Sequence, residues 1–203
     1  MKGSQRAVFL DLQGTLGGEG LDDIMGFSFY PTAARAVGLV NDAGLLAIVI
    51  TNQSHISKGL FTMQDFERKV AELKAELAVD GARVDAVYCC PHSSKDGCEC
   101  RKPLPGMLLK ARADFDIDLC RSYVVGDAGA WDMALARKVG SKAVLVRTGL
   151  GESSLCGYRH TWRDIEPDHI AEDVLRGVEW IITQEGASEQ TAGGDAENRA
   201  PQP

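Results

Sequence analysis

The chain has 203 residues, 44% of them hydrophobic, which is enough to bury one core and makes one domain the expectation. Its 22 basic and 29 acidic residues give a net charge of -7, which argues against electrostatic binding of nucleic acid, because that depends on basic contacts to phosphates. No apolar run approaches membrane-spanning length and no signal-like segment opens the chain, so the expected location is cytoplasmic, without membrane partners.

Strand and helix signals alternate along the chain. An apolar strand at residues 7–10 precedes a helix that begins near Pro31 and ends by Gly44, which suits a C-terminal cap. The continuous apolar run at 45–50 is typical of a strand buried on both faces of a parallel sheet. Thr62 begins a second helix with a capping-box pattern.

The second half of the chain continues this alternation. Strands are expected at 84–88, 122–125 and 142–146. One helix is expected to begin at 105, a second to cover 133–139 and a third to begin near 174. Residues 152–167 are expected to be irregular. This order predicts an α/β fold, a doubly wound, Rossmann-like parallel sheet with helices on both faces. Residues 185–203 contain almost nothing apolar and are expected to form a disordered tail, which leaves 1–184 as the domain.

Polar side chains gather where the predicted strands end or in the loops that follow. They are Asp11, Thr51, Asn52, Lys102, Asp127 and Asp132. Any one of them could be a helix cap or an ordinary loop residue. Because functional groups in such sheets collect at the carboxyl ends of the strands, we expect these side chains to meet. Together they supply a carboxylate nucleophile, a hydroxyl donor, a cation and a carboxylate pair suited to Mg²⁺.

Over roughly residues 6–150 these groups resemble the four motifs of the haloacid-dehalogenase (HAD) superfamily of phosphohydrolases. The matching segments are DLQGT at 11–15, Thr51 in VITNQS, Lys102 in CRKP, and GDAGAWD at 126–132. The resemblance implies that Asp11 attacks phosphorus and forms an aspartyl-phosphate, while Thr51 and Lys102 hold the phosphoryl group. It also implies Mg²⁺ bound by Asp11, Asp127 and the backbone carbonyl of Gln13, with Asp132 supporting Lys102 or a metal-bound water.

A second cluster of potential metal ligands follows the strand expected at 84–88. The ligands are Cys90, His92, Cys98 and Cys100, spaced as C-x-H-x5-C-x-C. This spacing suits a closed tetrahedral Zn²⁺ site, and disulfides, the alternative, are disfavoured by the cytosolic expectation. The neighbouring Cys89 should point the other way in an extended chain. Cys120 and Cys156 stand alone and are expected to be small buried hydrophobic residues.

The predicted zinc loop, residues 89–101, ends directly against Lys102, so a metal there would hold Arg101 and Lys102 in place. With TNQSHISKGLFT and CRKPLPGM, this arrangement resembles the heptose-bisphosphate and histidinol-phosphate phosphatase branch, whose members lack a large cap domain. The resemblance implies a small phosphorylated metabolite as the ligand, and a monomer is the default. Residues expected to contact the phosphate or the rest of the substrate are Thr15, Asn52, Ser54, Lys58 and Arg101, although Lys58 could equally be a solvated lysine.

Gln13 departs from the first motif of the family. In family members this position is a second Asp, which protonates the leaving group and then activates water, and an amide can do neither. Acid–base catalysis contributes typically ~10²–10⁴-fold, so a slowed or specialised phosphatase is expected, with Gln13 orienting water as in some GTPases. The alternatives are a catalytically inactive protein that binds a phosphorylated ligand, or a zinc-loop module for nucleic acid or a partner, which the acidic net charge disfavours.

Overall fold

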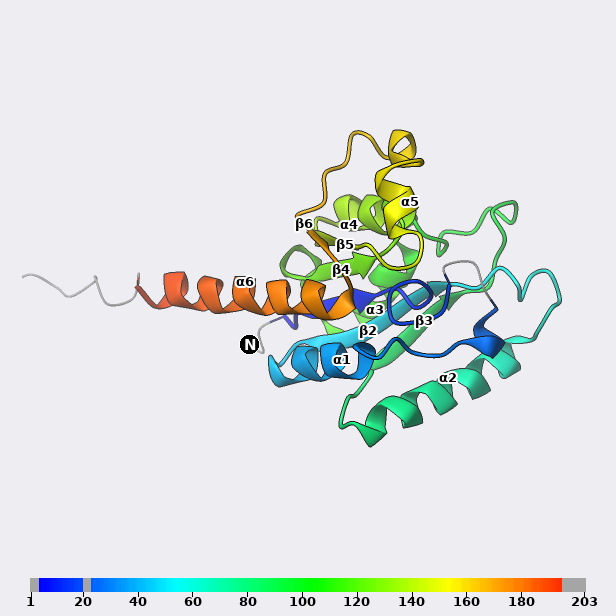
Figure 1. Cartoon of the computed structure of the whole chain (residues 1–203), viewed down its shortest axis with the longest axis horizontal. Helices are drawn as coiled ribbons and strands as arrows, with labels where there is room; N and C mark the ends of the chain where they lie inside the picture. Colours follow the sequence, from blue (N-terminus) through cyan, green and yellow to red (C-terminus); the bar gives the residue numbers. More distant parts are fainter. Residues whose placement is uncertain (1–3, 20–22, 195–203) are drawn as a thin grey trace, which may run out of the picture.

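Six parallel strands form one sheet in the order β3-β2-β1-β4-β5-β6 (Figure 1). The computed structural model describes residues 4–19 and 23–194. The strands are β1 (Ala7–Leu10), β2 (Leu46–Asn52), β3 (Ala86–Cys90), β4 (Tyr123–Gly126), β5 (Lys142–Val146) and β6 (His169–Ala171). The predicted doubly wound α/β fold is confirmed.

Helices connect the strands and cover both faces of the sheet. They are α1 (Ala33–Asp42), α2 (Met63–Val79), α3 (Gly106–Phe115), α4 (Ala134–Val139), α5 (Gly151–Leu155) and α6 (Val174–Gly194). Short 3₁₀ turns lie at Ile24–Gly26, Leu119–Arg121 and Arg159–Thr161, and a π-helical turn at Gly129–Met133 leads directly into α4.

The side chains of β1 alternate between two core layers because successive residues of a strand point to opposite faces. Val8 and Leu10 pack in the core that α1, α2 and α6 cover. Ala7 and Phe9 pack in the core on the other face, under α3 and α4. The sheet is therefore buried on both sides, which explains why β1 and β2 are almost continuously apolar.

The order of the strands reverses next to β1. From β1 the chain builds outward to β2 and β3, then returns to place β4 on the other side of β1. Ligands of doubly wound sheets bind in the crevice at such a point, beyond the carboxyl ends of the strands. Asp11 follows β1 and Asp127 follows β4, so carboxylates flank this crevice.

The helix ends follow the local sequence signals. Thr62 accepts a hydrogen bond from the backbone N–H of Asp65, whose carboxylate accepts one from the backbone N–H of Thr62, so the predicted capping box is confirmed. Beyond α1 and at the end of α4, Gly44 and Gly140 adopt φ of +69° and +77°. Glycine takes up this left-handed conformation without strain from a side chain.

Short segments differ from the sequence expectations. Residues 152–167, expected to be irregular, contain most of α5 and a 3₁₀ turn, and the edge strand β6 was not predicted. The third strand ends at Cys90, two residues beyond the expected end. These elements depend on tertiary contacts: the Trp162 indole donates to the Ser154 carbonyl at 3.1 Å, and β6 exists through its pairing with β5.

The C-terminal helix extends beyond its predicted end. α6 continues through Gly194, so residues 185–194 of the expected disordered tail are helical, whereas 195–203 lie outside the described residues. Glu185 explains part of this correction, since it accepts a hydrogen bond from the Tyr123 hydroxyl at 2.7 Å and pairs with Arg6.

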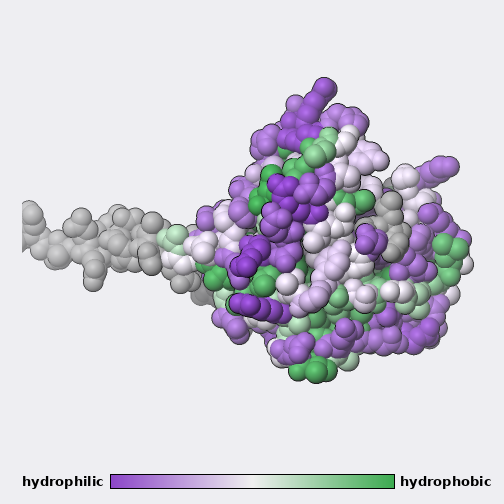
Figure 2. All heavy atoms as spheres, viewed as in Figure 1, coloured by the Kyte–Doolittle hydropathy of each residue, from purple (hydrophilic) through white to green (hydrophobic). Residues whose placement is uncertain are grey.

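The surface seen in Figure 2 is mostly hydrophilic, with hydrophobic side chains in small separate groups. Scattered apolar exposure of this kind is normal for a folded protein surface. Within the part of the chain that the structure describes, no helix has the length and apolar character needed to cross a membrane.

Candidate active site

Three buried carboxylates gather at the switch point of the sheet. One oxygen from each of Asp11, Asp127 and Asp132 lies within 4.8 Å of the others. Backbone amides hold all three: Leu12 N donates to Asp11 Oδ1 at 2.8 Å, Leu150 N donates to Asp127 Oδ2 at 2.7 Å, and Ala128 N donates to Asp132 Oδ2 at 3.0 Å. The loops after β1 and β5 therefore orient the carboxylates that the sequence had placed at strand ends.

The ammonium group of Lys102 bridges two of these carboxylates. Its Nζ lies 2.7 Å from Oδ1 of Asp11 and 2.7 Å from Oδ1 of Asp132. Burial by itself lowers the pKa of Lys102, but the adjacent negative charges of Asp11 and Asp132 outweigh it and raise that pKa above its ordinary value. Lys102 is therefore a permanent cation that links Asp11 to the π-helical turn carrying Asp132.

The carboxylates carry more negative charge than Lys102 can balance. Burial, together with the negative charges of Asp11 and Asp132, raises the pKa of Asp127 to about 8. Burial also raises the pKa of Asp11 to about 6, although Lys102 opposes the change. When all three carboxylates are ionised, they exceed the one ammonium by two negative charges. An oxygen-rich donor set with this excess fits a divalent cation such as Mg²⁺.

The chain after Asp11 passes close against Asp127. Gly14 adopts φ of +80°, and a Cβ there would lie 2.0 Å from Asp127 Oδ2, so this position requires glycine. From the loop after β5, Thr148 Oγ1 donates to the Gly14 carbonyl at 2.6 Å and holds the turn in place.

Thr15 directly follows Gly14 in this turn. Its side chain is fully buried, does not line the pocket beside Asp11, and has no hydrogen-bond partner for its hydroxyl among the described residues. The predicted contact of Thr15 with the phosphate therefore stays a prediction, since the residue is buried and lies outside the pocket lining.

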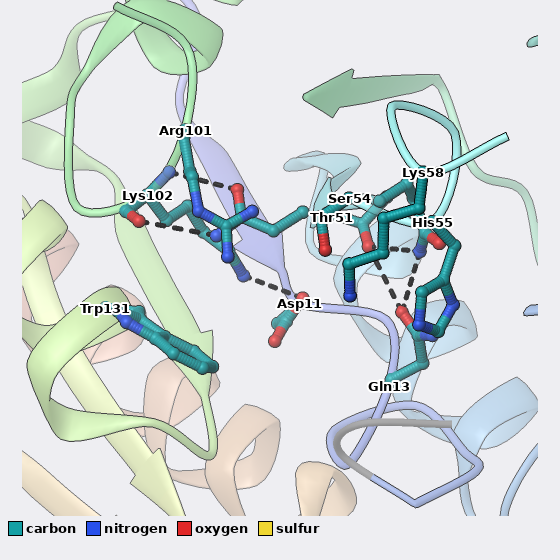
Figure 3. Close-up of a pocket in the computed structure, with 11 residues that line it drawn as sticks. Asp11, Gln13, Thr51, Ser54, His55, Lys58, Arg101, Lys102 and Trp131 are labelled. Carbon is teal, nitrogen blue, oxygen red and sulfur yellow. Dashed lines mark hydrogen bonds and ion pairs between the residues drawn. The ribbon is translucent and has the colours of Figure 1, made fainter. Parts of the chain in front are cut away.

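A pocket of about 240 Å³ opens beside Asp11 (Figure 3). Its lining residues are Asp11, Gln13, Thr51, Asn52, Gln53, Ser54, His55, Lys58, Arg101, Lys102 and Trp131. Apart from Thr15, every residue predicted to bind phosphate or substrate lies in this lining. The lining combines the cationic side chains of Lys58, Arg101 and Lys102 with the single carboxylate of Asp11, and this positive balance favours an anionic ligand.

Asn52 and Arg101 connect the pocket to the cysteine- and histidine-containing loop. Asn52 Oδ1 accepts from Lys102 N at 3.0 Å, and Asn52 Nδ2 donates to the Lys102 carbonyl at 3.3 Å. Arg101 Nη1 donates to the His92 carbonyl at 3.1 Å. Asn52 thus fixes the main chain that carries Lys102, and Arg101 is held by the neighbouring loop while it lines the pocket.

Gln13 is buried and its amide oxygen accepts hydrogen bonds within the protein. Gln53 Nε2 donates to Gln13 Oε1 at 2.7 Å, and the Thr51 hydroxyl makes a longer hydrogen bond of 3.4 Å to the same oxygen. Because an amide does not titrate near neutral pH, no proton-transfer group stands at this position.

Gln53 and Trp131 line the pocket but were not singled out from the sequence. Gln53 lies two residues after Thr51, and positions i and i+2 of an extended chain share a face, so this spacing could have identified it. Trp131 is the one large aromatic residue in the segment GDAGAWD, between Asp127 and Asp132. Its indole forms the wall of the pocket opposite Gln13 (Figure 3).

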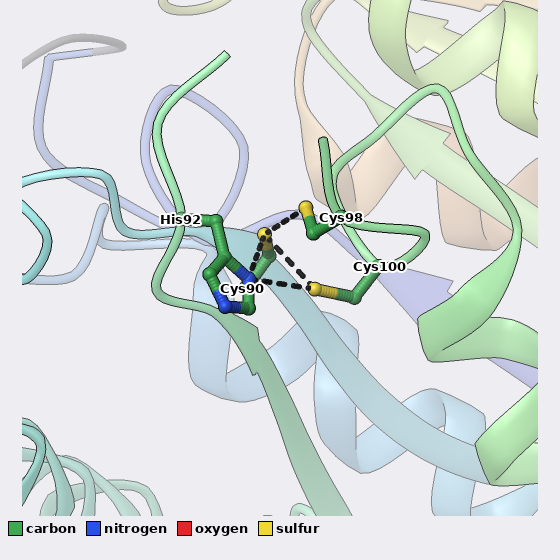
Figure 4. Close-up of side chains that lie close together, drawn as sticks. All are labelled: Cys90, His92, Cys98 and Cys100. Atoms are coloured by element: carbon green, nitrogen blue, oxygen red, sulfur yellow. Dashed lines mark hydrogen bonds between the residues drawn. The ribbon is translucent and has the colours of Figure 1, made fainter. Parts of the chain in front are cut away.

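Cys90, His92, Cys98 and Cys100 converge at the end of β3 (Figure 4). Cys90 Sγ lies 3.7 Å from Cys98 Sγ and 3.2 Å from Cys100 Sγ, and His92 Nδ1 lies 3.2 Å from Cys100 Sγ. Thiolates bound at ~2.3 Å in a tetrahedral site would lie about 3.8 Å apart, so small adjustments would fit this cluster to Zn²⁺. All six cysteines of the chain are free thiols.

The remaining cysteines differ in their surroundings. Cys89 packs against the core on the α1 and α2 side, whereas Cys90 belongs to the opposite core, which confirms that the two side chains point apart. Cys120 and Cys156 are exposed, contrary to the expectation that they are buried. Both lie at the surface, Cys120 in a 3₁₀ turn and Cys156 at the end of α5.

Comparisons with known proteins identify the family of this chain. Residues 99–176 match the family described as HAD-hyrolase-like. The D-glycero-D-manno-heptose-1,7-bisphosphate 7-phosphatase of Thermosynechococcus vestitus is 39% identical over 194 residues, covering 87% of this chain and 95% of the relative. The D-glycero-beta-D-manno-heptose-1,7-bisphosphate 7-phosphatase of Yersinia pestis is 39% identical over 160 residues, covering 73% and 84%.

A solved structure shows the same architecture. It is the D,D-heptose 1.7-bisphosphate phosphatase from B. bronchiseptica, crystallised with magnesium and phosphate. The two structures superpose with a TM-score of 0.80 at 28% sequence identity, and the match covers 89% of this chain and 99% of the other. The chain therefore belongs to the HAD family of hydrolases, and it is a phosphatase. Within that family it lies in the branch of the heptose-bisphosphate phosphatases.

Proposed function

We propose that this phosphatase is a Mg²⁺-dependent phosphomonoester hydrolase that acts on a small phosphorylated sugar. The observation that carries the proposal is the Asp11 carboxylate, held 2.7 Å from the buried Lys102 ammonium at the edge of a cationic pocket. A heptose bisphosphate, named as the substrate of the relatives, is the first candidate. Histidinol phosphate is the second, from the sequence resemblance.

In the proposed reaction an Asp11 oxygen attacks phosphorus while the bond from phosphorus to the leaving-group oxygen breaks. Thr51 and Lys102 donate hydrogen bonds to the phosphoryl oxygens, and Asp132 keeps Lys102 in position. When bound by Asp11, Asp127 and the Gln13 carbonyl, Mg²⁺ supplies positive charge against those oxygens. Water then hydrolyses the aspartyl-phosphate and releases inorganic phosphate. The proposed contacts to the rest of the substrate are Asn52, Ser54, Lys58 and Arg101.

A structural Zn²⁺ bound by the Cys90, His92, Cys98 and Cys100 side chains is part of the proposal. Its support is the convergence of four suitable ligand atoms within 4.8 Å of one another. Cys100 directly precedes Arg101 and Lys102, so fixing the loop would also fix two cations of the pocket.

Gln13 limits the leaving groups that the enzyme can handle. Without a general acid the rate is lower by a factor of ~10²–10⁴, which corresponds to a barrier higher by about 3–5 kcal/mol. Positioning and electrostatic stabilisation are of similar size and remain available. Acyl and aryl phosphates, whose leaving groups need little protonation, should therefore react faster than simple alkyl phosphates.

A second candidate function is a protein that binds a phosphorylated ligand without turnover. It is favoured by the non-titrating Gln13 amide, which is hydrogen-bonded at the position of the expected proton-transfer group. Such a protein would keep the cationic pocket and its ligand affinity.

The test is phosphate release from sugar, aryl and acyl phosphates with Mg²⁺, comparing the native chain with Gln13→Asp and Asp11→Asn. We expect native turnover to be fastest on acyl and aryl phosphates, a gain on sugar phosphates in Gln13→Asp, and no turnover in Asp11→Asn. Turnover by Gln13→Asp alone would favour the non-catalytic binder. Full activity of Asp11→Asn would show that Asp11 is not the nucleophile.

A further inference from the structure

We propose that Gln53 is a positioning residue that turns the Thr51 hydroxyl into a hydrogen-bond donor toward the phosphoryl group and fixes the amide of Gln13. The inference rests on the proposed role of Thr51 in binding phosphoryl oxygens. Gln53 is a polar residue that is only 2% exposed.

The backbone of Gln53 is fixed on both sides. Its N–H donates to the Cys90 carbonyl at 2.8 Å, and its carbonyl accepts from Ile56 N at 3.1 Å. The first bond continues the pairing of β2 with β3. The second closes a turn that contains the pocket residues Ser54 and His55. The Gln53 side chain therefore leaves from a rigid base.

The amide nitrogen of Gln53 uses its hydrogens inside the protein. A primary amide nitrogen carries two hydrogens, and Gln53 Nε2 lies 2.7 Å from Gln13 Oε1 and 2.8 Å from Thr51 Oγ1. Each distance is that of an ordinary hydrogen bond. Two acceptors on two sides define the plane of the amide and leave this nitrogen no hydrogen for a ligand.

The consequence for Thr51 follows from counting protons. A hydroxyl has one hydrogen, and because Thr51 Oγ1 accepts from Gln53, its own hydrogen must point elsewhere. Its protein acceptor, Gln13 Oε1, is 3.4 Å away, well beyond the usual O–H···O distance of about 2.7–2.8 Å. A phosphoryl oxygen in the pocket at ordinary distance would be the better acceptor. Gln53 thus prepares Thr51 to donate.

The consequence for Gln13 changes the expectation drawn from the sequence. Its Oε1 receives the Gln53 amide and also faces the Thr51 hydroxyl. This oxygen therefore accepts from protein donors, so water orientation of the kind a glutamine performs in GTPases would fall to the other groups of the Gln13 amide. Gln13 and Gln53 act together as a matched amide pair behind Thr51.

The experiment measures binding of inorganic phosphate by calorimetry in the presence of Mg²⁺, which does not require turnover. Gln53→Met removes both donors at similar length without adding charge, and Gln53→Glu removes them but adds charge. We expect Gln53→Met to weaken phosphate binding by about threefold to tenfold, the size of one ordinary hydrogen bond. Ser57→Ala, in the same loop but outside the pocket lining, is the matched control and should bind as the native chain does.

The assignment is overturned if Gln53→Met binds phosphate normally, even if Gln53→Glu does not, because charge alone would then explain the loss. A merely structural role would lower the melting temperature of Gln53→Met without changing its phosphate affinity, which also overturns it. Thr51→Val completes a double-mutant cycle: if Gln53 acts through Thr51, adding Gln53→Met to Thr51→Val should change affinity less than twofold. Additive losses contradict the inference, whereas normal binding by Thr51→Val itself contradicts the proposed role of Thr51.

Discussion

At the scale of single residues, burial sets the charge balance of the site. Lys102 forms ion pairs with Asp11 and Asp132 in a region almost without solvent. Removing charges from water is costly, and a buried cluster with unequal charges depends on its partners. The raised pKa of Asp127, about 8, reflects this imbalance.

We predict that the Mg²⁺-free protein loses stability as the pH rises from about 4 to about 8. The pKa values of Asp11 and Asp127 are about 6 and about 8 in the folded state, against 3.8 ordinarily. The folded state therefore binds more protons than the unfolded state across this window, so the free energy of unfolding decreases with increasing pH. Thermal melts over this range, with and without added Mg²⁺, measure the effect.

Added Mg²⁺ should raise the melting temperature most near pH 8, because it binds the ionised carboxylates of the folded state. Asp127→Asn is the control: it should flatten the pH dependence and reduce the response to Mg²⁺. If added Mg²⁺ does not change the melting temperature of the native protein at pH 8, the proposed Mg²⁺ site is contradicted.

At the scale of elements, the π-helical turn Gly129–Met133 connects the sheet to the pocket. It follows β4, carries Asp132 to Lys102 and brings Trp131 to the pocket wall. Turns of this kind are frequent at functional sites. Gly129 N donates to Ser154 Oγ at 2.8 Å, and a Cβ on Gly129 would lie 2.0 Å from the Trp162 ring.

Gly129→Ala should therefore displace the turn, lower the free energy of unfolding by about 1–3 kcal/mol through overpacking, and reduce phosphate release through the shift of Asp132. Urea unfolding and steady-state kinetics measure the two effects. Gly38→Ala is the matched control, because Gly38 lies inside α1 with nothing within 4 Å of its added Cβ. Helix propensity predicts that Gly38→Ala raises stability by about 0.5–1 kcal/mol without changing activity. Equal effects of the two substitutions would argue against a special role for the turn.

At the scale of the whole molecule, the strand order brings distant parts of the chain to one edge. Residues from the loops after β1, β2 and β4 meet there, and the loop after β3 contributes Arg101 and Lys102. The cysteine and histidine cluster lies in this last loop, so the proposed Zn²⁺ links folding of the loop to completion of the pocket.

We predict about one Zn²⁺ per chain by elemental analysis, from the four-ligand rule. Cys98→Ala should lose the metal, melt at a lower temperature and release phosphate more slowly, because Arg101 and Lys102 lose their support. Cys120→Ala, which changes an exposed cysteine outside the cluster, should retain metal, stability and activity. If Cys98→Ala lacks zinc but keeps the melting temperature and activity of the native chain, the metal has no structural role.

The sequence by itself determined what depends on short stretches of chain. Alternating apolar strands and amphipathic helices predicted the sheet, and Thr62 and Gly44 marked helix ends through local hydrogen bonding and backbone conformation. Asp11 and Asp127 could be placed at one edge because parallel strands end there.

Only the tertiary structure decided what depends on contacts between distant segments. The sequence offered Asp132 two partners, and the fold places its carboxylate against Lys102. Thr15 lies within a matching motif, yet in the structure it is fully buried. Gln53 was not among the predicted site residues, and the structure places its amide against Gln13. The physical reason is that burial and the contacts of a side chain follow from packing and register between distant segments, whereas a local pattern gives at most the face of the strand on which a residue lies.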